Sequence, residues 1–376
     1  MNPVQKTQNP FIIRGYAGPE FFCDRQKETS ALLSALEAGR DVVLVSPRRI
    51  GKTGLIHHLF HNLRIQSSDI HTFYMDIYPT QNLSDFVELL GETILGQLDA
   101  PIEKAMERVM RYVHSLVPKF SVDPLTGSPI VSLDTAERDN KATLKEIFEY
   151  LKSSEKQCYI AIDEFQQINE YPEKGVEALL RSYIQFLPNV HFIFAGSKQH
   201  MLQDMFLLPK RPFYQSAQMM DLHPLDREEY YQFCSRMCLR RSLFLDRELF
   251  YGLYERFSGY TWYIQQVMNR LFGFEVSPVQ ELVDFAVREI VSEQSDAYAR
   301  LYNLLSAGCR KLMKAVAKEG CVKGILSGSF IARYGLKAAS SVQTSLRKLM
   351  DNELISKTED GYTISDRFMA DWLRTL

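Results

Sequence analysis

The feature that most constrains the fold is a short loop that joins an apolar run to a helical run near residue 50. The run Asp41–Val45 is continuously hydrophobic after its first residue, which is typical of a strand buried on both faces. The sequence Ser-Pro-Arg-Arg-Ile-Gly-Lys-Thr follows at residues 46–53, and residues 54–63 then have a helical pattern. This order of strand, loop and helix predicts a phosphate-binding loop, the Walker A loop, at the end of a strand in a parallel α/β sheet.

Each part of this loop has an expected role in binding ATP and Mg²⁺. Gly51 permits a tight backbone turn, and the N-terminus of the following helix directs partial positive charge toward a phosphate. Lys52 is expected to neutralise the β- and γ-phosphate oxygens, and the Thr53 hydroxyl to be a magnesium ligand. Ser46 replaces the first glycine of the GxxxxGK[ST] pattern, which predicts weaker binding because serine turns less freely after a strand. The predicted phosphate contacts are Ser46, Pro47, Arg48, Arg49, Ile50, Gly51, Lys52, Thr53 and Gly54.

Two carboxylates follow a second buried apolar run. Residues 158–162 are apolar and lead directly into Asp163 and Glu164, which is a Walker B pattern. Asp163 is expected to hold Mg²⁺ through water, and Glu164 to act as the general base on the attacking water. A solvated turn at the end of a strand is the alternative, and the phosphate loop upstream makes it the weaker one.

Further apolar runs predict the other strands of the sheet. The runs His71–Ile77, Cys158–Asp163 and Val190–Gly196 alternate with helical segments up to about residue 225, as expected for a parallel sheet with helices on both faces. Between them, two β-prone runs in Lys119–Leu133 flank a turn signal at residues 123–127. These runs predict an inserted surface hairpin, either an ordinary excursion or a partner-binding element.

Composition excludes several classes of protein. The 376 residues carry a net charge of −2 and are 45% hydrophobic, which is typical of globular domains. Residues 1–10 lack the apolar core of a signal peptide, and no run approaches the roughly 18 uninterrupted apolar residues of a membrane span. The six cysteines are scattered without a CxxC pair, so we expect them to be reduced. These observations predict a cytoplasmic protein with no membrane partner.

Four groups of residues carry a resemblance to a known family. They are Phe21-Phe-Cys-Asp-Arg25 with Glu28, similar to F-x-G-R-x-x-E; the loop at residues 47–53; Asp163-Glu-Phe-Gln166, similar to DE-x-Q; and Ala195-Gly-Ser197 with His223-Pro-Leu225. On these residues the chain resembles, over nearly its full length, the archaeal-type ATPases of the STAND branch of AAA+-like P-loop proteins. The resemblance implies an ATP-binding core, a helical lid and a winged helix, and a regulated ATPase that couples its nucleotide state to the arrangement of its domains.

Two residues take their expected roles from AAA+-like enzymes. Ser197 follows the fourth predicted strand, where such enzymes place a polar residue, called sensor 1, between the γ-phosphate and Glu164. Arg211 lies between the fourth and fifth strands, in the region from which a neighbouring subunit often contributes an arginine to the transferring phosphoryl group. An ordinary surface arginine is the alternative for Arg211. The chain departs from the family where Gln215-Ser216 replaces Gly-Arg and where Gly259-Tyr-Thr-Trp262 replaces Gly-Gly-x-Pro.

The pattern becomes helical after the predicted sheet. Asp226 is expected to cap the first of these helices, and the sequence predicts an ATP-binding core at residues 1–224, a helical lid at 225–300 and a winged-helix domain at 301–376. In the last domain, Ser329–Tyr334 and Ala338–Met350 predict a helix-turn-helix, and Asp360-Gly361 predicts a hairpin turn.

The positive charge of the chain is concentrated in this last domain. Residues 301–376 contain 12 Lys and Arg and 7 Asp and Glu, a charge of +5, so the rest of the chain carries −7. The second helix is expected to bury Val342, Leu346 and Leu349. The candidate DNA contacts on its outward side are Lys337, Ser341, Thr344, Arg347 and Lys348. Docking of this face to a protein partner, or to the chain's own core, is the alternative.

Two hypotheses of function follow from these motifs. The first is an ATPase switch in which ATP closes the core against the lid and hydrolysis by Glu164 releases the winged helix. The second is a DNA-binding regulator gated by ATP and ADP with little or no hydrolysis. GTP is disfavoured as the nucleotide because Asn140-Lys-Ala-Thr143 fails the last position of the N-K-x-D motif. His57 and His61 are expected on a solvated helix face rather than at a zinc site.

Overall fold

Five parallel strands form the sheet that carries the phosphate loop. The computed structural model describes residues 9–95, 118–122, 129–133 and 139–376. The strands follow the spatial order β2-β5-β6-β1-β7, so the sheet is parallel throughout the described residues. Their bounds are β1 Val42–Val45, β2 Ile70–Asp76, β5 Gln157–Asp163, β6 Val190–Gly196 and β7 Gln218–Asp221. The four apolar runs are therefore confirmed as strands of one sheet.

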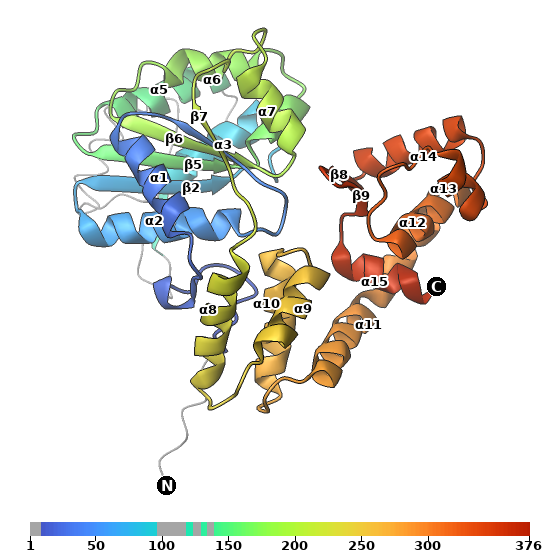
Figure 1. Cartoon of the computed structure of the whole chain (residues 1–376). Coiled ribbons are helices and arrows are strands. Elements are labelled where there is room, and N and C mark those ends of the chain that lie inside the picture. Colours follow the sequence, from blue (N-terminus) through green and yellow to red (C-terminus); the bar gives the residue numbers. More distant parts are fainter. Residues whose placement is uncertain (1–8, 96–117, 123–128, 134–138) are drawn as a thin grey trace. The chain divides into compact units, whose positions relative to one another are not determined.

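Helices cover both faces of this sheet (Figure 1). Side chains alternate along β1, so that Val43 and Val45 belong to the core under α3, α5, α6 and α7, whereas Val42 and Leu44 are buried on the face of α1 and α2. Burial on both faces explains why the strands are continuously apolar. The helices are α1 Gln26–Glu37, α2 Lys52–Gln66, α3 Leu83–Leu95, α5 Asn140–Lys152, α6 Val176–Ile184 and α7 Gln199–Leu207.

The hairpin predicted within residues 119–133 is confirmed as an antiparallel strand pair. Strand β3 (Pro118–Val122) pairs with β4 (Pro129–Leu133), with Phe120 opposite Val131. The predicted turn at residues 123–127 lies outside the described residues.

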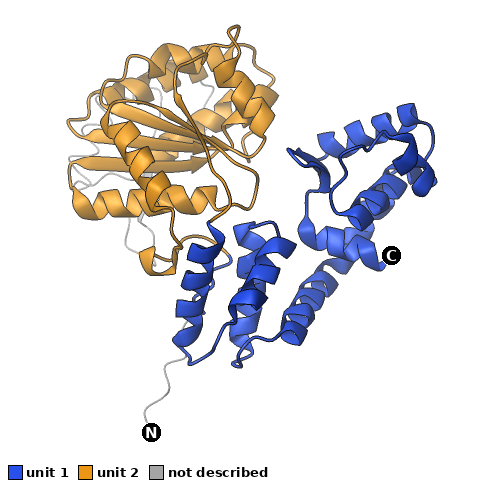
Figure 2. Cartoon of the chain, in the orientation of Figure 1, with its two compact units in different colours: residues 1–13, 226–376 blue, residues 14–225 orange. Residues whose placement is uncertain are grey.

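The chain divides into two compact units, which we call the α/β unit (residues 14–225) and the helical unit (residues 1–13 with 226–376) (Figure 2). The sheet ends and the helices begin at the predicted position, and Asp226 caps α8 by accepting hydrogen bonds from the backbone N–H groups of Glu228 and Glu229. The predicted segment 1–224 needs one correction, because Asn9 and Phe11 pack with the helices of the other unit.

That correction rests on Asn9 and Phe11. Asn9 Nδ2 donates to the backbone oxygen of Asn269 at 2.8 Å, and Asn269 Nδ2 donates to the backbone oxygen of Phe11 at 2.7 Å. The Phe11 side chain is fully buried and packs edge-on against Phe272 of α10. Phe11 therefore contributes a buried apolar side chain to helices that come some 260 residues later in the sequence.

The helical unit begins with four helices and continues into a small α/β arrangement. The first helices are α8 Arg227–Leu239, α9 Arg247–Arg256, α10 Thr261–Gly273 and α11 Gln280–Leu304. Helix α11 runs across residues 300 and 301, so the predicted boundary between lid and winged helix lies inside a continuous helix. The remaining elements are α12 Ala307–Glu319, α13 Gly328–Arg333, α14 Ala339–Asp351, β8 Ile355–Thr358, β9 Gly361–Ile364 and α15 Arg367–Thr375.

The predicted helix-turn-helix and hairpin are confirmed as α13, α14 and β8–β9. Val342, Leu346 and Leu349 are buried as expected. Glycine is required at position 361 for a reason that the turn signal did not predict. The φ of Gly361 is +142°, and a Cβ there would lie 2.6 Å from the backbone oxygen of Val322. Tyr362 pairs with Val322 in a β-bridge, so glycine lets a third segment approach the hairpin closely.

Candidate nucleotide-binding site

The phosphate loop connects the end of β1 to the first residue of α2. Gly51 precedes α2 with φ of +101°, a left-handed conformation in which a side chain would be strained. Arg49 is also left-handed, with φ of +73°. Ser46 is buried, and its hydroxyl has no hydrogen-bond partner among the described residues. The loop thus turns sharply just before the helix N-terminus, as the motif predicts.

Arg25 supports this loop from the segment that precedes α1. Its buried guanidinium donates to the backbone oxygen of Ile50 at 3.2 Å and to Glu28 Oε1 at 2.8 Å. Arg25 and Glu28 are two of the residues that carried the family resemblance, and their position gives that motif a physical role. The Arg25 guanidinium holds the backbone of the phosphate loop at Ile50.

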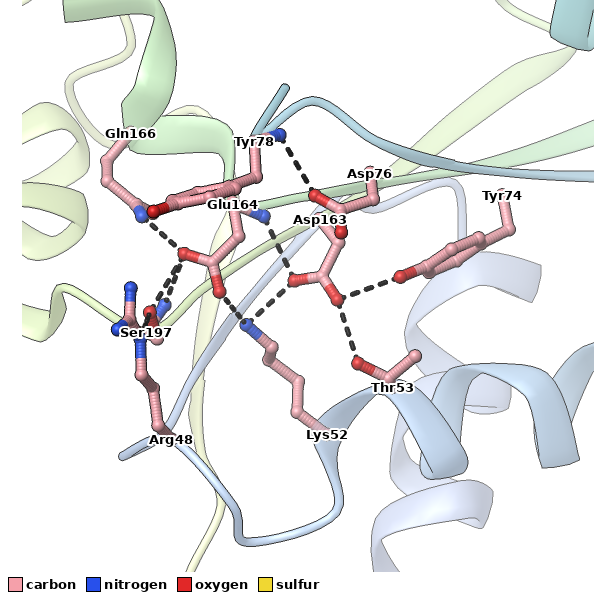
Figure 3. A network of polar contacts seen from close by, with 10 residues as sticks. All are labelled: Arg48, Lys52, Thr53, Tyr74, Asp76, Tyr78, Asp163, Glu164, Gln166 and Ser197. Carbon is pink, nitrogen blue, oxygen red and sulfur yellow. Dashed lines mark hydrogen bonds and ion pairs between the residues drawn. The ribbon is translucent and has the colours of Figure 1, made fainter. Parts of the chain in front are cut away.

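Lys52 joins the phosphate loop to the two carboxylates at the end of β5 (Figure 3). Its Nζ lies 2.7 Å from Asp163 Oδ1 and 3.4 Å from Glu164 Oε1, and Lys52 and Asp163 are both buried. The carboxyl ends of parallel strands lie at one edge of the sheet, so Thr53 and Asp163 come together there although they are 110 positions apart. The pairing of Walker A with Walker B residues follows from this topology.

Asp163 receives more donors than the sequence motif predicts. The hydroxyls of Thr53 and Tyr74 donate to Asp163 Oδ2 at 2.9 and 3.0 Å, and the backbone N–H of Glu164 donates to Oδ1 at 2.9 Å. Burial by itself raises the pKa of Asp163, but the Lys52 ammonium and these hydroxyls outweigh it and hold the pKa below its usual value. The carboxylate is therefore ionised, as a ligand for a cation has to be.

Glu164 is held by a second set of donors. Its Oε2 accepts hydrogen bonds from Gln166 Nε2 at 2.5 Å, from Ser197 Oγ at 2.8 Å and from the Ser197 backbone N–H at 3.3 Å. The backbone of Glu164 is left-handed, with φ of +56°. Gly196 makes room for this arrangement, because a Cβ there would lie 2.0 Å from Gln166 Oε1. The predicted pairing of Ser197 with Glu164 is thus present, together with Gln166.

Arg48 closes the network from the phosphate loop. Its Nε donates to Ser197 Oγ at 3.1 Å, so the loop after β1 and the residue after β6 are linked directly (Figure 3). Sequence reasoning assigned the backbone of Arg48 to a phosphate and missed this side-chain contact. It also missed Tyr74, which lies on β2 next to β5 and which no motif marks. The resemblance to DE-x-Q was the signal that could have found Gln166.

Asp76 is a third carboxylate at this edge of the sheet. It lies opposite Asp163 in the pairing of β2 with β5, and its Oδ1 accepts a hydrogen bond from the Tyr78 backbone N–H. Burial raises the pKa of Asp76; the Tyr78 hydrogen bond opposes that rise and the charge of Asp163 adds to it. Asp76 is therefore a third acidic side chain at the site, and no sequence motif marks it.

Arg211 lies in the same α/β unit, but it contacts residues outside the Lys52 network. Its guanidinium forms an ion pair with Glu177 Oε2 at 2.5 Å and donates to Asn169 Oδ1 at 2.5 Å. Its side chain is 28% exposed. A role as an arginine finger would require these local contacts to break.

The histidines after the phosphate loop are not on a solvated face, which corrects that expectation. His57 and His61 are half-buried, and the Tyr16 ring contacts both of them. The described residues contain no group of three or more His, Cys, Asp or Glu side chains placed to hold a metal ion. The aromatic contact of Tyr16 explains the position of these histidines on α2.

The candidate DNA contacts lie on the outer surface of the winged helix. Lys337, Ser341, Thr344, Arg347 and Lys348 are all exposed. The alternation of these residues with Val342, Leu346 and Leu349 gives α14 one buried and one polar face.

A family model described as an ATPase domain predominantly from Archaea matches residues 22–240, which is more than half of the chain. The chain belongs to this family. A second model, described as a probable winged helix domain, matches residues 296–375 of this archaeal-type ATPase.

Curated relatives of this archaeal-type ATPase include two uncharacterized ATP-binding proteins of Methanocaldococcus jannaschii. Each is 29% identical, over 169 and 175 residues, which are 42% and 44% of this chain. The matched part spans 45% of the length of each relative, less than half. The match supports a nucleotide-binding domain of archaeal type.

Solved structures of similar fold include a Walker-type ATPase of Pyrococcus abyssi, with a TM-score of 0.64 at 19% identity over 97% of this chain and 99% of the other. The ORC2 protein of Aeropyrum pernix, in ADPNP and ADP complexes, has a TM-score of 0.61 at 16% identity over 98% and 96% of the two chains. The ORC1 protein of the same organism, in complex with DNA, has a TM-score of 0.54 at 13% identity over 94% and 93%. These likenesses show the fold, an AAA+-like P-loop core followed by a lid and a winged helix.

No helix in the described part of the archaeal-type ATPase is both long and apolar enough to cross a membrane.

Proposed function

We propose that this archaeal-type ATPase hydrolyses ATP with Mg²⁺ and acts as a molecular switch that couples its nucleotide state to its winged helix. The observation that carries the proposal is a single polar network that joins the phosphate loop to the ends of β5 and β6 (Figure 3). Such a network brings a phosphate-binding cation, a candidate metal ligand and a candidate base to one edge of the sheet.

The residues present fit a Mg²⁺–ATP complex. The Thr53 hydroxyl and the Asp163 carboxylate are hard oxygen ligands, which Mg²⁺ prefers, and they already contact each other at 2.9 Å. The ideal Cβ position of Gly51 has no atom within 4 Å, so the loop has open space at its tightest point. Bound Mg²⁺ would neutralise charge on the phosphate oxygens as the terminal phosphoryl group is transferred.

Each protein group then has a defined task in hydrolysis. Lys52 moves its ammonium from Asp163 to phosphate oxygens, and the backbone N–H groups of residues 46–54, except Pro47, bind the remaining phosphate charge. Glu164 Oε2 accepts three hydrogen bonds from Ser197 and Gln166, whereas Oε1 has one contact among the described residues, with Lys52. Oε1 is therefore the oxygen that accepts the proton of the attacking water, and Ser197 and Gln166 orient the carboxylate.

A second candidate function is a DNA-binding regulator gated by ATP and ADP, with little or no hydrolysis. The observation that favours it is the exposed basic face of residues 337–348, on a domain of charge +5. Phosphate contacts by such a face supply most of the affinity for duplex DNA. Docking of the same face to a protein partner or to a second copy is the competing outcome. A cytoplasmic location is part of both proposals.

One experiment on purified protein separates the two functions. ATP and ADP affinities are measured by calorimetry, and ATP turnover is measured with Mg²⁺ or EDTA, each with and without duplex DNA. Mg²⁺-dependent turnover supports the hydrolysing switch. Tight ATP binding without turnover in any condition favours the second function, and the absence of ATP binding contradicts both.

A further inference from the structure

The helical unit contains a cavity of about 400 Å³ where the turn between α9 and α10 meets the β8–β9 hairpin and α15. The turn contributes Ser258 and Tyr260, β8 contributes Thr358, and α15 contributes its first residue, Arg367. The volume falls within the roughly 300–1,000 Å³ that is typical of small-molecule sites. The residues that line this cavity include no member of the nucleotide-site network and none of the five candidate DNA contacts.

Two of the three arginines that line the cavity form ion pairs with the same carboxylate. Asp371 Oδ2 pairs with Arg256 at 3.1 Å, and Asp371 Oδ1 pairs with Arg374 at 2.5 Å. Arg256 also pairs with Asp284 Oδ1 at 3.0 Å. Both oxygens of Asp371 are thus in contact with these two arginines.

Arg367 is the third arginine, and among the described residues its guanidinium has no acidic partner. It lies over the Tyr260 ring at 5.3 Å from the ring centre, which fixes the plane of its donors. Its Nε is buried without a hydrogen-bond partner among those residues. Arg367 is thus a cation that lines the cavity without an acidic partner among the described residues, and its charge is available to pair with an anion there.

The groups around Arg367 suit a phosphate as that acceptor. The arginine offers a planar set of N–H donors that matches phosphate oxygens in two contacts at once, and Ser258, which can donate a hydroxyl hydrogen bond, also lines the cavity. The remaining acid that lines the cavity is Asp360, which is exposed on the hairpin turn.

We propose that this cavity is a second ligand site, which binds a small phosphate-bearing molecule through Arg367. It goes beyond the proposed function because it lies entirely within the helical unit and uses neither the phosphate loop nor the recognition helix. A ligand there contacts both the α9–α10 turn and the winged-helix hairpin, and it therefore stabilises the arrangement of these two segments.

The cavity contains a reporter for its own occupancy. Cys321 lines the cavity and is the exposed cysteine, whereas the other five cysteines of the chain are buried. The rate of Cys321 alkylation by iodoacetamide is measured on the full chain with increasing inorganic phosphate, pyrophosphate or AMP, at constant ionic strength set with chloride. We expect saturable protection by at least one probe, and the order of the probes distinguishes a free phosphate from a nucleotide.

Two charge-matched variants locate the binding. Arg367→Gln is expected to weaken protection about tenfold or more, the scale of a lost charge-assisted hydrogen-bond pair. Arg300→Gln, at an exposed arginine of α11, is expected to leave it unchanged. Circular dichroism confirms that both variants are folded, and if Arg367→Gln is not, Arg367→Lys replaces it, since lysine keeps the charge without the planar donors and is expected to weaken protection less.

The Lys52→Ala protein separates this proposal from the nucleotide site. Protection that persists in Lys52→Ala supports a second site even if ATP binding is lost or never found. Three results overturn the proposal: no probe protects Cys321, protection is lost in Lys52→Ala, or protection in Arg367→Gln equals that of the wild-type protein. Protection by duplex DNA alone also overturns it and assigns Arg367 to the DNA surface.

Discussion

The nucleotide site and the basic face of the winged helix both carry charge, but they hold it in opposite ways. Around Lys52 the central charges are held inside the protein: Lys52 and Asp163 are buried, and Asp163 and Glu164 each accept two or more hydrogen bonds. On α14 the corresponding groups, Arg347 and Lys348, stand exposed on one face of the helix. A buried network depends on every member, whereas an exposed face acts through its summed charge. Single substitutions therefore test the first region, and paired charge reversals test the second.

The largest effect is expected from Lys52→Ala. The substitution removes the cation that faces the phosphates, so we expect ATP binding to be abolished in calorimetry while the chain remains folded. Lys152→Ala, at an exposed lysine at the end of α5, is the matched control. Wild-type affinity in Lys52→Ala would remove the assignment of this site.

Glu164→Gln is expected to have the next largest effect. Glutamine keeps the shape but cannot accept a proton, so ATP remains bound and turnover falls by about 10²-fold or more, the usual contribution of a general base. Steady-state phosphate release measures it, with Glu155→Gln at an exposed position as the control. Unchanged turnover would show that another group activates water.

Reversing the charge of Arg347 and Lys348 tests the exposed face. Changing both to Glu is expected to leave ATP binding intact and to remove the contact that the face makes. If the partner is duplex DNA, wild-type affinity falls steeply with salt, by about 0.9 in log K per log unit of salt for each neutralised phosphate. Anisotropy titrations at several salt concentrations, with ATP and with ADP, measure this slope. The control reverses Lys311 and Lys318, which are exposed on α12. DNA binding absent in both nucleotide states points to protein docking.

Tyr74→Phe is expected to give the smallest effect. It removes one of the donors that lower the pKa of Asp163, and a hydrogen bond to a charged group contributes about 1.5–3 kcal/mol. Because the folded pKa of Asp163 lies below the unfolded value of about 3.9, this stabilisation is present at neutral pH and is lost as pH falls through the folded pKa. Urea unfolding at stepped pH measures the difference from wild type. Tyr78→Phe, at a side chain that is 59% exposed, is expected to show none.

The sequence predicted the parts of the site that local motifs encode. The GK[ST] loop is one contiguous motif and the Asp-Glu pair is another, and each directly follows an apolar run. Their positions at strand ends therefore follow from the hydrophobic pattern alone. The partners across the sheet did not follow in the same way. Arg48 and Ser197 are 149 residues apart, and their contact depends on β1 lying next to β6, which the order of strands along the chain does not reveal.

Two other differences arise from tertiary contacts. Arg211 was placed by its position in a loop, but its partner Glu177 comes from α6 and no local signal connects them. Gly361 was assigned to a hairpin turn, and the structure shows that it is needed where the Val322 backbone approaches. In both cases a residue's surroundings come from elements distant in sequence, which periodicity and turn propensity do not describe.

The docking of Phe11 on α10 has a consequence for synthesis of the chain. Asn9 is made some 260 residues before its partner Asn269. At a typical elongation rate of about 5–20 residues per second, the N-terminal segment waits roughly 10 to 50 s for α10 to emerge from the ribosome. The α/β unit can complete its sheet during this interval, since all of its strands precede residue 225. Phe11 meanwhile stays without its Phe272 contact, and the helical unit is completed only after α10 has been synthesised.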